Sequence, residues 1–161
     1  MYPRCPECGK DFVRQSQRQG AFEHLLSVIR VYPFRCQVCT HRFRGLEWGE
    51  HSTQLIDQRE YERIPVRFAV SFSSDRIKGQ GNLIELSMGG CSLQTETRLP
   101  PGEVLQLSFQ ASEQDAHIRV EAIVVRSVRP PTVGMEFLRV PSPQKEALRQ
   151  VVLHHLSQQR V

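Results

Sequence analysis

Hydrophobic and polar residues alternate through most of the second half of the chain, which is the pattern of β-strands with one buried face. The segment 64–72 is the clearest case, with Val66, Phe68, Val70 and Phe72 on one face. Five further short strands are expected at 81–87, 90–96, 103–109, 117–128 and 132–140, between turns rich in glycine and proline. Six short strands at this spacing favour a mainly β fold, a small antiparallel barrel.

The pattern changes to a helical period at the end of the chain. Ser142 followed by Pro143 is a typical helix start, a capping residue with proline in the first turn. Apolar residues then recur at helical spacing at Leu148, Val151, Val152 and Leu156. We expect a C-terminal amphipathic helix that covers one mouth or edge of the barrel.

A second helical pattern lies near the amino terminus. Phe22, Leu25, Leu26 and Ile29 follow the spacing of one helical face. This apolar stripe is expected to pack against the barrel or against a second copy of the chain, which makes a homodimer one candidate assembly.

Composition and charge divide the 161 residues into two parts. Most of the net charge of +4 lies in residues 1–50, and the segment after residue 46 is polar without a clear period. We predict a small module at 1–46, a linker at 47–58 and the barrel with its helix at 59–161. No apolar run is long enough to span a membrane and no secretory signal is present, so a cytoplasmic protein without membrane insertion is expected.

Four cysteines form two C-x-x-C pairs, Cys5 with Cys8 and Cys36 with Cys39. Each pair can bind one side of a tetrahedral ion, and four thiolates make a closed structural zinc site. The pattern resembles a zinc ribbon with a helical insert. The alternatives are a redox dithiol or unrelated surface cysteines, but the βαβ context that a redox motif usually has is absent. Cys91 stands apart and is expected to be a buried thiol.

Two arginines, Arg59 and Arg63, lie four residues apart just before the first predicted strand. Further along, Glu85 and Ser87 are expected to point to the same side of a strand, just before a turn that contains Gly90. A guanidinium can meet guanine O6 and N7 with two parallel hydrogen bonds, and it also pairs with phosphate. The arginines are therefore either an anion-binding fork or solvated surface charge.

In these motifs the sequence resembles the PilZ family, bacterial receptors for cyclic di-GMP, whose signature is R-x-x-x-R followed by D/N-x-S-x-x-G. Arg59 and Arg63 match the first part, and Ser87 and Gly90 match the second. The resemblance covers about residues 57–157. It implies a six-stranded barrel with a C-terminal helix, in which Arg59, Arg63, Glu85, Ser87 and Gly90 bind cyclic di-GMP.

Glu85 departs from the family pattern, which has aspartate or asparagine at this position. Glutamate keeps the acceptor but moves the carboxylate outward by about one carbon–carbon bond, ~1.5 Å. The resemblance nevertheless implies a receptor and adaptor that passes cyclic di-GMP binding to a protein partner through a zinc-ribbon module. The alternatives are a PilZ adaptor that binds protein without nucleotide, and a zinc-ribbon nucleic-acid-binding protein with the barrel as scaffold. No catalytic constellation is found, so an enzyme is not expected.

Overall fold

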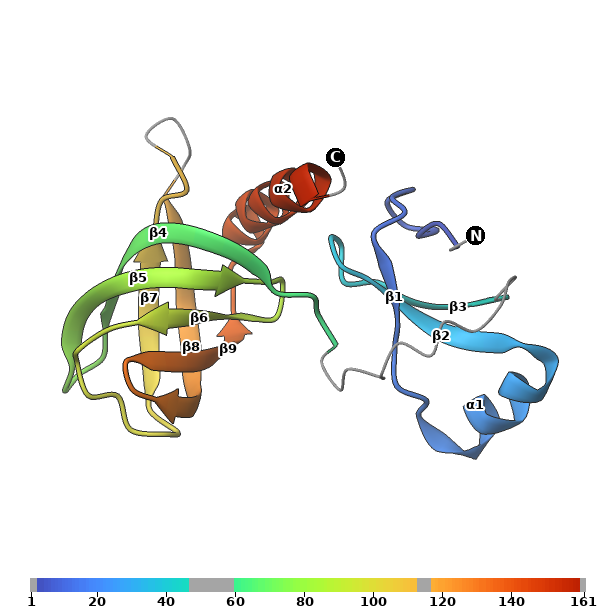
Figure 1. Cartoon of the computed structure of the whole chain (residues 1–161), viewed down its shortest axis with the longest axis horizontal. Coiled ribbons are helices and arrows are strands. Elements are labelled where there is room, and N and C mark those ends of the chain that lie inside the picture. Colours follow the sequence, from blue (N-terminus) through green and yellow to red (C-terminus); the bar gives the residue numbers. More distant parts are fainter. Residues whose placement is uncertain (1–2, 47–59, 113–116, 160–161) are drawn as a thin grey trace. The chain divides into compact units, whose positions relative to one another are not determined.

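The computed structural model describes residues 3–46, 60–112 and 117–159, which belong to two compact units, Met1–Glu62 and Arg63–Val161 (Figure 1). We call them the amino-terminal unit and the barrel unit. The predicted linker 47–58 lies outside the described residues. No helix in the described part of the chain is both long and apolar enough to cross a membrane.

The barrel unit contains a closed antiparallel barrel, which confirms the predicted fold class (Figure 1). Its six strands are β4 (Ile64–Ser73), β5 (Lys78–Leu86), β6 (Gly90–Gln94), β7 (Val104–Phe109), β8 (Ile118–Arg129) and β9 (Thr132–Arg139). They follow the order β4-β5-β6-β9-β8-β7 around the barrel, and β7 pairs with β4 to close it. Each strand overlaps the segment that the alternating pattern predicted.

The barrel interior is filled by the alternate residues of these strands. Along β4 every second side chain from Ile64 to Phe72 is buried, as a strand with one buried face requires. Helix α2 (Ser142–Gln159) buries the four predicted apolar residues and packs against β4 and β8. The ring of His155 on α2 meets the edge of Phe68 with 5.7 Å between ring centroids, so the helix extends the core beyond the strands.

The amino-terminal unit is a small three-stranded antiparallel sheet with one helical segment (Figure 1). The strands are β1 (Val13–Gln15), β2 (Val31–Cys36) and β3 (Arg42–Leu46), and β2 lies in the centre. Phe34 on β2 is buried and stacks on Phe43 of the paired strand at 6.0 Å. The sequence analysis did not predict these three strands, and the central strand β2 does not alternate between buried and exposed residues, since Pro33 and Phe34 are both buried.

The predicted helical insert is present as α1 (Gly20–Leu26) followed by the short 3₁₀ helix η1 (Ser27–Ile29). Its apolar stripe does not face the sheet of its own unit. Phe22, Leu25 and Ile29 are all exposed and only Leu26 is half-buried. The stripe therefore contributes little to the core of the amino-terminal unit.

Candidate metal centre and ligand-binding site

The four cysteines of the two C-x-x-C pairs come together in the amino-terminal unit. Their sulfur atoms all lie within 4.8 Å of one another, and three of the four residues are buried. Cys5 Sγ is 3.5 Å from Cys39 Sγ, and Cys8 Sγ is 3.6 Å from Cys36 Sγ. Zinc–sulfur bonds of about 2.3 Å at tetrahedral angles place the sulfurs about 3.8 Å apart, so the cluster fits zinc.

Two matching backbone turns aim the sulfurs at one point. Gly9, directly after the first pair, has a φ of 70°, and Thr40, directly after the second, has a φ of 67°. In the second turn the backbone N–H groups of Val38 and Cys39 both point at Cys36 Sγ, each at 3.4 Å. Such N–H groups stabilise a thiolate, which is the form that binds metal.

Burial alone would keep part of this cluster protonated. It raises the pKa of the thiols of Cys36 and Cys39 above the ordinary value, with burial as the largest cause in both cases. A divalent cation is the charge that can hold four such sulfurs as thiolates in one place. The donor set, spacing and N–H groups could therefore hold a structural zinc ion.

Arg63 forms a three-residue polar cluster with two neighbouring strands of the barrel. It lies directly before β4, and its Nη1 donates to Glu85 Oε2 on β5 and to Ser92 Oγ on β6, each at 3.1 Å. Ser92 Oγ donates in turn to Glu85 Oε2 at 2.8 Å. The register explains this meeting, because Glu85 is opposite both Pro65 of β4 and Ser92 of β6. The side chains of Arg63 and Glu85 remain 37% and 38% exposed, so the cluster is open to a ligand.

Ser87 lies in the turn between β5 and β6, and Gly90 is the first residue of β6. Ser87 follows the end of β5 and is buried, so strand alternation does not place it beside Glu85 as the sequence analysis expected. Its hydroxyl donates to the carbonyl oxygen of Gly90 at 3.1 Å and accepts from the N–H of Gly89 at 3.3 Å. A Cβ on Gly90 would collide with the carbonyl oxygen of Met135 on β9. Both residues therefore shape the turn next to Glu85.

Arg59 lies outside the described residues, but the three residues after it are held within the amino-terminal unit. The side-chain amide of Gln37 accepts from the N–H of Glu62 at 2.6 Å and donates to the carbonyl oxygen of Glu60 at 3.3 Å. Arg35 donates to the hydroxyl of Tyr61 at 3.2 Å and pairs with the Glu60 carboxylate at 3.4 Å. Its guanidinium also lies over the Tyr61 ring, 5.6 Å from the centroid.

Ser92, Arg35 and Gln37 were missed by the sequence analysis. Ser92 carried one usable signal, since it is a polar residue between Cys91 and Leu93 on β6, and all three are buried. Arg35 and Gln37 carried none, because their partners are more than 20 residues away. Cys91 is buried as expected, and burial raises the pKa of its thiol to about 12.

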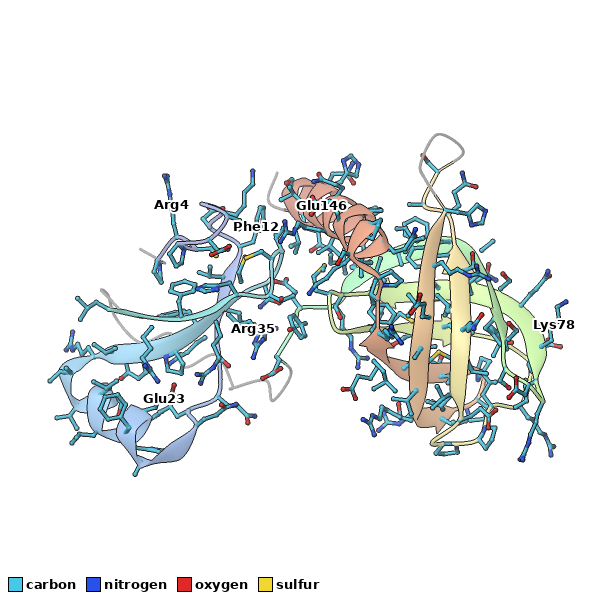
Figure 2. All side chains as sticks on the ribbon, turned by 180° about the vertical axis from the view of Figure 1, so that it is seen from behind. Arg4, Phe12, Glu23, Arg35, Lys78 and Glu146 are labelled. Carbon is cyan, nitrogen blue, oxygen red and sulfur yellow. The ribbon has the colours of Figure 1, made fainter. Side chains whose placement is uncertain are left out.

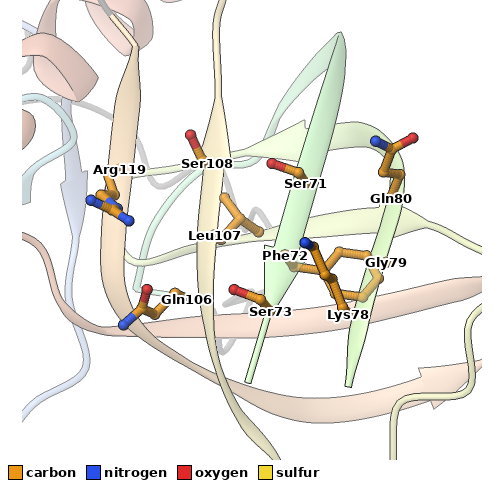
Figure 3. A pocket seen from close by; sticks show the side chains of 10 residues that line it. All are labelled: Ser71, Phe72, Ser73, Lys78, Gly79, Gln80, Gln106, Leu107, Ser108 and Arg119. Carbon is orange, nitrogen blue, oxygen red and sulfur yellow. The ribbon is translucent and has the colours of Figure 1, made fainter. Parts of the chain in front are cut away.

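A second concave area lies on the barrel away from these residues. A hollow of about 280 Å³ lies along β4, β5, β7 and β8. Figure 3 shows the side chains that line it. Ser71, Lys78, Ser108 and Arg119 are among the residues that line it. None of the predicted ligand-binding residues borders this hollow, so its shape adds nothing to the site around Arg63.

Comparison with solved structures finds barrels of similar fold. The PilZ domain of YcgR from Escherichia coli, solved with c-di-GMP, is 17% identical with a TM-score of 0.53, over 65% of this chain and 95% of that one. The inhibitor of motility (MotI/DgrA) of Bacillus subtilis is 18% identical with a TM-score of 0.57, over 81% of this chain and 66% of that one. YcgR from Escherichia coli in complex with c-di-GMP is 16% identical with a TM-score of 0.56, over 92% of this chain and 75% of that one.

At these identities the structural similarity shows the fold alone. Comparison with curated protein sequences finds no match. Comparison with protein families matches residues 57–154 to the PilZ domain, which is more than half of the chain and includes all six barrel strands. The chain therefore belongs to the PilZ family, a family of cyclic di-GMP receptors.

Proposed function

We propose that this chain is a receptor for cyclic di-GMP, bound by Arg59 and Arg63 together with the strand motif at Glu85, Ser87 and Gly90. The observation that carries the proposal is the position of Arg63. Its guanidinium lies at the entrance of β4, more than a third exposed, and it contacts the motif residue Glu85. The match to the PilZ domain includes both arginines and the strand motif.

The chemistry of the ligand suits these groups. Cyclic di-GMP offers two guanine edges and two phosphates, and an arginine can pair with either through parallel hydrogen bonds. Glu85 supplies an acceptor beside the arginine, and the turn closed by Ser87 keeps this acceptor in place. Without ligand, the Glu85 carboxylate already accepts a hydrogen bond from Arg63. A ligand that binds Arg63 must therefore replace Glu85 as the partner of this arginine.

The amino-terminal unit is the proposed output module, with one structural zinc ion held by Cys5, Cys8, Cys36 and Cys39. Glu62, whose N–H is held by Gln37, is bonded directly to Arg63. No spare residue therefore separates the part of the chain held by Gln37 from the arginine that binds the ligand. A ligand that moves Arg63 would pull on the contacts of Arg35 and Gln37, and this is how we propose that binding reaches the zinc module and then a protein partner.

Calorimetric titration of the full zinc-loaded chain with cyclic di-GMP tests the receptor function. Arg63→Ala should weaken binding by roughly 30- to 1000-fold, corresponding to about 2–4 kcal/mol for truncating one side of a charge-assisted contact. Arg63→Lys should restore only part, since it keeps the charge and loses the fork. Arg129→Ala, an exposed arginine at the end of β8, is the matched control and should bind as the wild type does. Absence of binding by the wild type at high micromolar ligand would refute the proposal.

The transmission step has its own measurement. Hydrogen exchange at the Glu62 amide reports the contact with Gln37, and it should change when cyclic di-GMP binds. Unchanged exchange with ligand bound would leave a receptor without the proposed output.

A protein-binding adaptor that does not bind nucleotide is the second candidate. It is favoured by the fact that Arg63 already has two partners, Glu85 and Ser92, so no unpaired cation requires a ligand. Under this alternative neither the wild type nor a variant that removes the Glu85 charge would bind cyclic di-GMP.

A further inference from the structure

Helix α1 and the 3₁₀ turn after it present their apolar side chains to solvent and their carboxylate to the interior. Phe22, Leu25, Val28 and Ile29 are 60%, 67%, 79% and 62% exposed, whereas Glu23 is 2% exposed. This is the reverse of an ordinary surface helix, whose apolar stripe faces the core. We call these four apolar residues the α1 apolar surface.

A buried ion pair holds the helix in this orientation. Both Glu23 carboxylate oxygens accept from Arg42, at 2.8 Å each, and Arg44 and the N–H of Gln19 add further hydrogen bonds. Figure 2 labels Glu23 beside the helical segment. These hydrogen bonds, those from Arg42 above all, lower the pKa of Glu23 to about 2. Turning the helix to bury its apolar stripe would expose this pair or leave a buried charge alone, which is strongly destabilising. The outward stripe is therefore a built feature of the unit.

The α1 apolar surface lies among positive charges. Glu23 is the one acidic residue between residues 12 and 46, where six arginines occur. The Arg44 guanidinium lies over the Phe22 ring at 5.6 Å, and Arg30 is exposed directly after Ile29. With the single carboxylate of this stretch buried, what faces outward is apolar and cationic.

We propose that the α1 apolar surface binds the interface of an anionic phospholipid bilayer, with its side chains among the acyl chains and its arginines among the headgroup phosphates. A bilayer supplies apolar depth and negative charge in one surface, and amphipathic segments flanked by basic residues bind there without spanning it. Leu25, Val28 and Ile29 have no hydrogen-bonding groups with which to contact nucleic acid bases. A second copy would bring its own arginines against these, so charge complementarity is lacking in a symmetric dimer.

The proposal stands apart from nucleotide binding, because every residue that carries it belongs to the amino-terminal unit. It is therefore tested with the full zinc-loaded chain in the absence of cyclic di-GMP. Co-sedimentation with vesicles that contain phosphatidylglycerol is compared with co-sedimentation with vesicles of phosphatidylcholine alone. We expect binding to the first, weakened by added salt, and little binding to the second.

Paired variants test the residues. Phe22→Ser combined with Leu25→Ser should lower partitioning at least tenfold, whereas Leu138→Ser, a side chain on β9 that is 52% exposed, should not. Arg30→Gln should lower it by about fivefold, the effect of one basic residue near an anionic surface, and the control Arg129→Gln should not. Retained zinc content and an unchanged circular dichroism spectrum show that each variant is folded.

Three results would overturn the proposal. The first is an absence of binding to either vesicle, and the second is equal binding to both. The third is a dimer, seen by light scattering, that the Phe22 and Leu25 substitutions dissociate, because the surface would then belong to a second copy of the chain.

Discussion

Glu85→Gln is the substitution that separates the two roles of the carboxylate beside Arg63. In the structure Glu85 Oε2 accepts from Arg63 and from Ser92, so it occupies the cation that we propose binds the ligand. Glutamine has the same length and keeps an oxygen acceptor, but it carries no charge. If Glu85 competes with the ligand for Arg63, the substitution should tighten binding of cyclic di-GMP.

The size of the effect follows from the exposure of the pair. Arg63 and Glu85 are 37% and 38% exposed, so solvent screens their attraction and the pair contributes about 0.5–1 kcal/mol. Separating it before binding weakens the apparent affinity by roughly two- to fivefold. Removing the carboxylate also removes its repulsion of the ligand phosphates. We expect Glu85→Gln to tighten binding by about fivefold, with a smaller gain at high salt.

Isothermal titration at two salt concentrations measures this change. Glu121→Gln is the matched control, since Glu121 forms a similar exposed pair with Arg139 at 3.0 Å elsewhere on the barrel. Glu85→Asp keeps the charge and shortens the reach, so it separates charge from length. Weaker binding by Glu85→Gln would refute the competition argument and identify the carboxylate as an acceptor for the ligand. An unchanged affinity would show that the Glu85 charge neither competes with the ligand nor supports its binding, and it would equally refute the competition argument.

Three further results are expected. Purified protein should contain one zinc ion per chain, and Cys36→Ser should release it and unfold the amino-terminal unit while the barrel persists; metal analysis and circular dichroism test this, and an unchanged fold without metal would contradict it. Gly90→Ala should lower the free energy of unfolding by about 1–3 kcal/mol, because the added Cβ meets the backbone of β9, and an unchanged denaturation midpoint would show that the turn can relax. The pKa of Cys91 is raised to about 12, so the barrel should lose stability as the pH rises from about 9 toward 12, and this group should have no effect below about pH 9. Denaturant titrations of Cys91→Ala should show no such loss. An equal loss in this variant would assign the effect to another group.

The elements of the barrel were predictable because strand geometry leaves a direct trace in the sequence. Alternate residues of a half-buried strand face opposite sides, so Val66, Phe68, Val70 and Phe72 alternate with polar residues whatever the strand pairs with. The helix α2 was predictable for the same reason, with a period near 3.6. The four-cysteine cluster was predictable in part, because a C-x-x-C turn is local and brings its own two sulfurs together.

The sequence analysis failed where the outcome depended on register or on distant partners. Ser92 lies 29 residues after Arg63 in the sequence. The two side chains meet only because β6 pairs with β5 in one particular register. Gly90 stays a predicted position for ligand approach, but the sequence could not show the second demand for glycine there, because a Cβ would meet Met135 of β9, more than 40 residues away. Ser87 was expected on a strand face, and the strand ends one residue before it.

By itself, the sequence determined which residues share a face, where four thiols can meet and which family the barrel belongs to. Only the tertiary structure decided whether each face of a helix or strand is buried, and against which other element it packs. The stripe of α1 shows the difference: its period is plain in the sequence, but its direction is outward because Arg42 and Arg44 hold Glu23 inside. Periodicity records the geometry of one element, whereas burial depends on contacts between elements, and a single buried ion pair can reverse the side that a hydrophobic period would bury.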